Sequence, residues 1–180
     1  MAEYVALLRG INVGGHKKVN MEDLRQAFSS WGLQNVKTVL ATGNIVFESP
    51  VTDSGSLACT IEDKIKTIFG LDVSVILRTL QEIQELVNAS PFDGITVTSQ
   101  TRLYVTFLSE KPNTSLEIPY ESPEKDFRIL RVSESEVCSV LTVTPNRGTT
   151  KAMDILEKEF GKNVTTRNWN TVIKIAQLSA

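Results

Sequence analysis

The chain has 180 residues, 41% of them hydrophobic, and a formal net charge of −2. This length and hydrophobic share suffice for one ordinary domain, or for two small ones, without metals or disulfides. The negative net charge argues against binding driven by bulk attraction to nucleic acid. No apolar run approaches the ~20 residues of a membrane span, and the N-terminus has no basic export signal. We therefore expect a cytoplasmic protein without membrane association.

The first half of the chain predicts a βαββαβ order of elements. The expected elements are a strand at 4–11, a helix between Asn20 and Gly32, strands at 36–41 and 45–48, a helix at 54–69 and a strand at 73–77. Asn20 is a good N-cap, and Gly32 and Gly70 stand where helices end. Helical spacing places Leu57, Ile61, Ile65 and Ile68 on one apolar face of the second helix. This order predicts two helices on one face of a four-stranded antiparallel sheet, the ferredoxin-like arrangement.

The second half repeats this order less regularly. The expected elements are a helix at 79–89, strands at 102–108, 127–132 and 137–143, a helix at 150–160, an extended run at 163–166 and a helix at 169–178. The first helix of the repeat is degenerate. We predict an α+β protein with a ferredoxin-like subdomain at 1–78, a linking helix and loop at 79–98, and a second, irregular ferredoxin-like subdomain with a C-terminal helix at 99–180.

Cysteine and histidine are scarce in this chain. Cys59 and Cys138 make no disulfide framework and match no zinc-binding spacing, and both lie in apolar-patterned segments that predict buried thiols. His16 is the single histidine, and no metal ligands cluster along the sequence. We therefore expect neither a metal nor a cofactor.

The segment LLRGINVGGHKKVN, residues 7–20, looks at first like a phosphate-binding loop. The spacing from Gly10 to Gly15 is that of a Walker A loop, but His16 stands in its lysine position and Lys17 in its hydroxyl position. The loop therefore lacks the ligand for Mg²⁺ and the counter-charge for the β- and γ-phosphates. The dinucleotide pattern G-x-G-x-x-G is absent as well.

Two interpretations of this loop remain open. In the structural one, Gly14 and Gly15 let the chain turn with positive φ, and acidic residues in the first turn of the next helix repel anions. In the functional one, the loop binds an anionic or polar partner through four side chains, namely Arg9, Asn12, Lys17 and Lys18. Arg9 directly follows an apolar central strand, so its charge needs a carboxylate or a ligand as partner.

A second polar segment, TTRNWNT at residues 165–171, allows two interpretations as well. In the structural one a helix begins here, Asn168 or Asn170 caps it, and Arg167 pairs with an acid. In the functional one Arg167, Asn168 and Asn170 form an edge that recognises a planar or phosphorylated ligand. Spacing alone does not decide between them.

Charge is distributed unevenly along the chain. Residues 1–40 carry five basic and three acidic side chains, and residues 147–180 carry six basic and three acidic ones. The middle, residues 81–136, is acidic, with five basic and ten acidic side chains. We therefore hypothesise that the two basic ends meet in a cleft between the subdomains. There the side chains named for the two segments would bind an anionic or polar small ligand.

Two other classes of function stay open as alternatives. For an enzyme acting on a phosphorylated or nucleotide-like substrate, any Ser-His-Asp or Cys-His mechanism would have to use His16, which lies on a glycine-rich loop that holds a base poorly. An RNA- or DNA-binding protein could use Tyr4 and Phe47 on the two central strands, but neither strand has the aromatic-glycine signature of such proteins. The sequence leaves the oligomeric state open.

Three segments resemble a known family. LLRGINVGGHKKVNMEDLR, ATGNIVF and VTTRNWNTVIKIAQL are similar to the bacterial family known only as domain of unknown function 1697, and the resemblance covers essentially the whole chain. It implies two ferredoxin-like subdomains and no established activity. Family members usually carry a Ser-Lys-containing turn before the penultimate helix, where this chain has PNRGTTK at 145–151, with Arg147 and Lys151 as possible substitutes.

Overall fold

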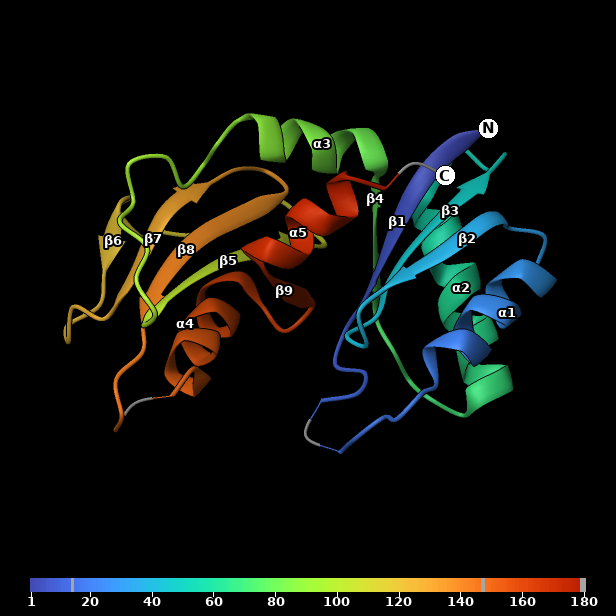
Figure 1. Cartoon of the computed structure of the whole chain (residues 1–180), viewed down its shortest axis with the longest axis horizontal. Coiled ribbons are helices and arrows are strands. Elements are labelled where there is room, and N and C mark those ends of the chain that lie inside the picture. Colours follow the sequence, from blue (N-terminus) through green and yellow to red (C-terminus); the bar gives the residue numbers. More distant parts are fainter. Residues whose placement is uncertain (14, 147, 179–180) are drawn as a thin grey trace. The chain divides into compact units, whose positions relative to one another are not determined.

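The computed structural model describes residues 1–13, 15–146 and 148–178, and these residues form two antiparallel sheets and five helices. They divide into two compact units (Figure 1). Unit 1 comprises Met1–Asn88 and the C-terminal helix from Thr171 onward, and unit 2 comprises Ala89–Asn170. The mixed α+β class expected from the sequence is confirmed. Among the described residues, no helix is long and apolar enough to span a lipid bilayer.

In its first segment, Met1–Asn88, unit 1 contains the βαββαβ order and one further helix. Its elements are β1 (Ala2–Leu8), α1 (Met21–Ser30), β2 (Gln34–Val39), β3 (Asn44–Ser49), α2 (Ser54–Phe69), β4 (Val75–Thr79) and α3 (Leu80–Asn88). The strands lie in the order β2-β3-β1-β4, and each neighbouring pair is antiparallel. Figure 1 shows α1 and α2 side by side on one face of this sheet.

Local signals explain where the two long helices of unit 1 begin and end. The Asn20 side chain accepts hydrogen bonds from the first backbone N–H groups of α1, and Asp53 does the same for α2. These side chains satisfy donors that a helix N-terminus otherwise leaves without partners. Gly70 ends α2 in the left-handed conformation at φ 68°, which glycine adopts without a steric penalty.

The core of unit 1 lies between the sheet and helices α1 and α2. Tyr4 and Phe47 pair there with ring centroids 5.9 Å apart, and Phe28 of α1 packs edge-on against Phe47. These two strand aromatics, considered above as a surface for stacking bases, are therefore buried under α1 and are not accessible to a nucleic acid. The helical pattern also placed Ile68 on the buried face of α2, but its side chain is 53% exposed.

Unit 2 consists of a larger sheet and one packed helix. Its elements are β5 (Thr101–Leu108), β6 (Tyr120–Glu121), β7 (Phe127–Val132), β8 (Glu136–Thr142), α4 (Thr150–Phe160) and β9 (Val164–Asn168). The strand order is β6-β7-β8-β5-β9, again antiparallel throughout. With the short β6 set aside, β7-β8-β5-β9 repeats the order of unit 1, and the described residues between β5 and β7 form no helix.

Helix α4 covers one face of this sheet. Ala152 and Leu156 of α4 pack on Phe127, Ile129 and Leu141 of the strands. The last helix, α5 (Trp169–Ala176), begins at the unit boundary. Its indole at Trp169 packs edge-on against Phe92, with centroids 5.0 Å apart. These contacts give unit 2 a core of its own.

The two cysteines differ in environment. Cys138 is buried in β8, as the sequence indicated, and burial raises the pKa of its thiol to about 12. Cys59 is exposed on α2, so the expectation of a buried thiol there was wrong. It lies between Leu57 and Ile61 in sequence, and the helical turn of about 100° per residue directs it away from their buried face.

Candidate functional site

The candidate site is the segment between β1 and α1, residues 9–20, which we call the β1–α1 loop. It leaves the end of β1 beside two other connections of unit 1. The backbone N–H of Leu8 donates to the carbonyl of Gly43 at 2.9 Å, and that of Arg9 donates to the carbonyl of Ser74 at 2.9 Å. The loop therefore starts in a fixed position, between the β2–β3 turn and the residues that precede β4.

Asn12 fixes the fold of the β1–α1 loop. Its Nδ2 donates to the carbonyls of Val19 at 3.0 Å and Ala41 at 2.7 Å, and its Oδ1 accepts from the N–H of Val19 at 2.8 Å. Its backbone N–H donates to the carbonyl of Lys17 at 3.1 Å. The backbone of Asn12 has φ 56°, a left-handed conformation that asparagine tolerates better than most residues. The asparagine predicted as a ligand contact thus joins the two ends of the loop and the adjacent turn.

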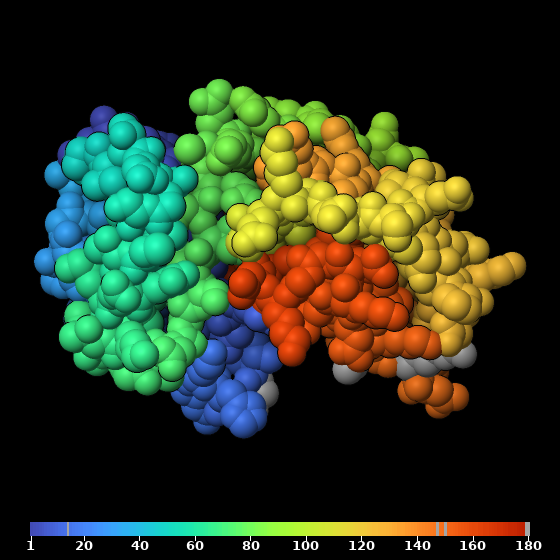
Figure 2. Space-filling model, turned by 180° about the vertical axis from the view of Figure 1, so that it is seen from behind, coloured from blue at the N-terminus to red at the C-terminus, as the bar shows by residue number. Residues whose placement is uncertain are grey.

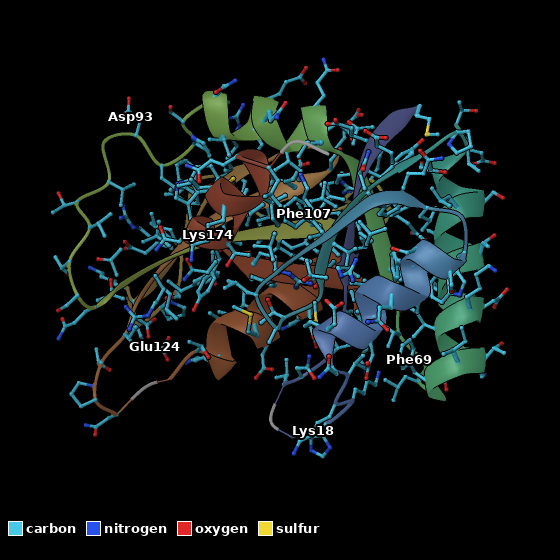
Figure 3. The ribbon with its side chains drawn as sticks, turned by 45° about the vertical axis from the view of Figure 1, so that its right-hand side comes forward. Lys18, Phe69, Asp93, Phe107, Glu124 and Lys174 are labelled. Atoms are coloured by element: carbon cyan, nitrogen blue, oxygen red, sulfur yellow. The ribbon has the colours of Figure 1, made fainter. Side chains whose placement is uncertain are left out.

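The two lysines of the loop occupy different environments. Lys17 Nζ donates to the carbonyl of Asp72 at 2.7 Å, and the Asp72 carboxylate lies 3.1 Å from Lys66 Nζ. Lys18 lines an open pocket of about 400 Å³ together with four other loop residues, namely Asn12, Gly15, Val19 and Asn20. Figure 3 shows Lys18 at the outer end of the loop. The pocket is therefore bordered by one exposed ammonium group and by backbone that Asn12 holds in place.

The start of α1 contributes little to the binding of an anion. The Asn20 side chain already accepts from the N–H groups of Glu22 and Asp23, at 2.9 and 3.2 Å. Glu22 is charged at neutral pH, and hydrogen bonds from Arg25 and Gln26 keep it charged in acid as well, because they lower its pKa to about 2. This carboxylate opposes an incoming anion, as the sequence suggested. An anion at the loop would depend on the lysines rather than on the helix end.

The conformation of the loop glycines agrees in part with the structural interpretation, in which glycines let the chain turn with positive φ. Gly10 and Gly15 have φ 72° and 77°, so positive φ occurs where the sequence expected it at Gly15. Gly14, for which the same was expected, lies outside the described residues. His16 is exposed and its backbone N–H donates to the carbonyl of Val13 at 3.0 Å. A lone exposed imidazole on a turn is a poor general base, because no side chain of the described residues orients it.

The second predicted segment, residues 165–171, lies in unit 2 except for Thr171. Its arginine is buried, whereas Asn168 and Asn170 are exposed. Arg167 is 7% exposed, and its Nη1 donates to Thr165 Oγ1 at 2.6 Å and to the carbonyl of Thr166 at 3.1 Å. Burial lowers the pKa of this guanidinium to about 10. Asn168 Oδ1 accepts from the N–H of Asn170 at 2.9 Å, a local turn at the start of α5. Arg9 belongs to unit 1 and Arg167 to unit 2, and a common basic face of the two stays a prediction.

The turn before α4 differs from the family pattern and lies beside a second pocket. Arg147 lies outside the described residues, and Lys151 forms an ion pair with Glu124. Lys151 also lines a pocket of about 310 Å³ together with Asp126 and apolar residues of β7, β8 and α4. Asp126 Oδ1 accepts from Ser122 Oγ at 2.9 Å. The charged groups at this pocket therefore already have partners within unit 2.

Sequence reasoning missed the residues that hold the loop from a distance. Ala41 and Asp72 contribute only backbone carbonyls, so no side-chain pattern marks them. Among the described residues, no three or more His, Cys, Asp or Glu side chains come together as metal ligands.

Comparisons with known proteins support the fold and give no activity. The solved structure of the conserved bacterial protein SP0830 from Streptococcus pneumoniae is 24% identical, with a TM-score of 0.67, and the match covers 98% of this chain and 97% of that one. At this identity the likeness shows the fold alone. No curated protein shows significant similarity to the chain. Residues 1–137 match the family described as "Protein of unknown function (DUF1697)". Because this match covers most of the chain, the protein belongs to the DUF1697 family.

Proposed function

We propose that the protein is a binding module for a small anionic ligand, with the β1–α1 loop of unit 1 as its binding surface. The observation that carries this proposal is the pocket of about 400 Å³ beside Lys18, within a loop that Asn12 holds by three side-chain hydrogen bonds. A loop whose shape is fixed before binding loses less conformational entropy when a ligand arrives. Lys18 supplies a positive charge that solvent and ligand can reach.

The chemistry of the loop favours a phosphate or carboxylate group over a neutral ligand. Lysine acts on phosphate as a compact point charge with three donors, whereas arginine grips such groups in a fixed two-pronged geometry. Lys17 can turn from the carbonyl of Asp72 to an anion, because that hydrogen bond is exposed. Both lysines are exposed. The attraction is therefore screened by salt, and binding should weaken as the ionic strength rises.

Two alternative functions, an enzyme and a nucleic-acid-binding protein, differ from this proposal in what they require of the site. An enzyme acting on a phosphorylated or nucleotide-like substrate would share this anion subsite, and substrate turnover would distinguish it from a binding module. A nucleic-acid-binding protein would need a surface other than the Tyr4–Phe47 pair, because both rings are buried.

We infer in addition that each unit is a ferredoxin-like subdomain, complete in unit 1 and without its first helix in unit 2. The βαββαβ order and the strand order β2-β3-β1-β4 of unit 1 support this inference. The order β7-β8-β5-β9 supports it for unit 2.

The test is a titration of the full chain with phosphate, pyrophosphate and ATP, followed by backbone amide chemical shifts. We expect shifts at residues 12–20 that saturate, and binding several-fold weaker in Lys18→Ala. Lys158→Ala is the matched control, because it removes an equal charge from an exposed position on α4 of unit 2. Equal affinity in the two variants, or shifts that avoid the loop, would refute the assignment.

A further inference from the structure

Unit 1 contains a second pocket, on the side of α2. It has a volume of about 250 Å³ and lies between α2, the turn that follows α1 and the end of β3. Leu57 and Ile61 of α2 are buried beneath it at 6% and 1% exposure, while Val51 at its edge is 40% exposed. Figure 2 shows the outer surface of α2, coloured teal to green. The pocket thus combines an apolar interior with an open side.

Three polar side chains of α2 form a row along one side of this pocket. Ser56, Thr60 and Lys64 follow each other at intervals of four residues, so they lie on one face of α2. Thr60 Oγ1 donates to the carbonyl of Ser56 at 3.0 Å, which leaves its lone pairs directed outward. A ligand lying along α2 would therefore meet hydroxyl groups first and an ammonium group at the far end.

Lys64 is the charged group of the pocket. Its Nζ lies 5.6 Å from the centroid of the Trp31 ring, within the range of a cation–π contact. Trp31 itself packs on the core aromatic Phe28 with centroids 5.0 Å apart, which fixes the indole as a wall. No carboxylate of a described residue forms an ion pair with Lys64. The ammonium group therefore lies at an apolar pocket, and no described carboxylate neutralises it.

The N-terminus of α2, just beyond Ser56 of the pocket, has the opposite charge. Asp53 caps α2 there, and its Oδ1 accepts from the N–H groups of Gly55 and Ser56 at 3.1 and 3.3 Å. The start of the helix is thus occupied by its own carboxylate and repels an anion. The distance along α2 from Asp53 to Lys64 is on the order of 16 Å, since a helix rises about 1.5 Å per residue. An anionic ligand can be stabilised only at the Lys64 end.

We propose that this pocket binds a small monocarboxylate with a compact apolar body. The apolar body occupies the space above Leu57 and Ile61, and the carboxylate lies beside Lys64 at the edge of the Trp31 ring. The pocket of about 250 Å³ holds roughly eight waters at about 30 Å³ each, which matches a ligand of about ten non-hydrogen atoms. This site is separate from the β1–α1 loop, and the proposal is independent of the function proposed for that loop.

Phenylacetate is a suitable probe, and phenylacetamide is its neutral counterpart of the same shape. We would follow the indole N–H resonance of Trp31 in the full chain, with Trp169→Phe used to assign it. We expect phenylacetate to shift this resonance with a dissociation constant on the order of 1 mM, as befits about ten atoms. Phenylacetamide should bind about fivefold more weakly, because it lacks the charge that Lys64 attracts.

Two variants with one control complete the test. Lys64→Met keeps most of the side-chain volume and should weaken phenylacetate about fivefold, whereas Lys66→Met removes an equal charge from the same helix and should change nothing. Thr60→Leu should fill the pocket and abolish binding in a protein whose circular dichroism stays native. Equal affinities for the two probes, an unchanged affinity in Lys64→Met, or no binding to the wild type at 10-fold above the expected constant would overturn the proposal.

Discussion

Replacing Asn12 by alanine tests the claim that one side chain holds the β1–α1 loop together. The substitution removes three hydrogen bonds that the amide makes with Val19 and Ala41. It also places an alanine at φ 56°, where the Cβ approaches the following carbonyl. Both effects act on the folded state, and both should lower the free energy of unfolding of unit 1.

The magnitude follows from these two terms. A half-exposed hydrogen bond contributes about 0.5–1 kcal/mol net, so three of them contribute about 2 kcal/mol. The left-handed backbone adds about 1 kcal/mol for alanine relative to asparagine. We therefore expect Asn12→Ala to destabilise unit 1 by about 3 kcal/mol. Asn12→Gly tolerates the positive φ, and it should be about 0.5–1 kcal/mol more stable than Asn12→Ala even after its larger unfolded-state entropy is included.

Urea denaturation monitored by tryptophan fluorescence measures this difference. The Trp169→Phe background leaves Trp31 as the reporter, so the transition describes unit 1 rather than an average over both units. The same variants should bind phosphate more weakly, because the backbone that surrounds Lys18 is no longer fixed. A change of less than about 0.5 kcal/mol in Asn12→Ala, or a glycine variant less stable than the alanine variant, would refute the role assigned to Asn12.

Three further outcomes are expected. Gly43→Ala should destabilise unit 1 by about 3 kcal/mol in urea, because its φ is 85° and a Cβ would meet core side chains at 2.8–2.9 Å. The native protein should react with one equivalent of a thiol reagent at pH 8, at the exposed Cys59, because burial raises the pKa of Cys138 to about 12; two rapid equivalents would contradict this. In Arg25→Ala the pKa of Glu22 should rise from about 2 towards 4.5, the ordinary value of a glutamate, because the main hydrogen bond that lowers it is gone; an NMR titration measures this pKa.

The sequence predicted those features that depend on neighbouring residues. Asn20 and Gly70 mark the ends of helices through contacts within one turn, so their roles could be read from the chain alone. The antiparallel sheet of the first half followed from the order of its elements, because short connections restrict the possible topologies. These parts of the fold needed no knowledge of distant contacts.

Burial of individual side chains was less predictable. Helical spacing indicated the inner face of α2 correctly at Leu57, Ile61 and Ile65, but not at Ile68. Helical periodicity gives the direction of a side chain, and it does not show whether other residues cover that turn. For the same reason an apolar neighbourhood in sequence suggested a buried thiol at Cys59, which is exposed.

The role of individual site residues could not be predicted from the sequence. Asn12 was selected for its polar amide, yet that amide is bonded to Ala41, a residue distant in sequence whose side chain carries no signal. No sequence pattern marks the pocket beside Lys64, because the Trp31 indole and the α2 side chains that line it come from separate segments. A contact between distant segments becomes visible only when the topology has placed them together.

The exposure of a basic side chain, rather than its charge alone, determines whether it can bind an anionic ligand. Arg167 and Lys18 looked equivalent in the sequence, as basic residues in polar segments near the two ends of the chain. The guanidinium of Arg167 is buried and already donates to Thr165 and to the carbonyl of Thr166, so an anion would have to replace hydrogen bonds within the strand. Lys18 is exposed and borders an open pocket, where an anion replaces only water. The free energy of binding an anion should therefore be more favourable at the β1–α1 loop than at residues 165–170.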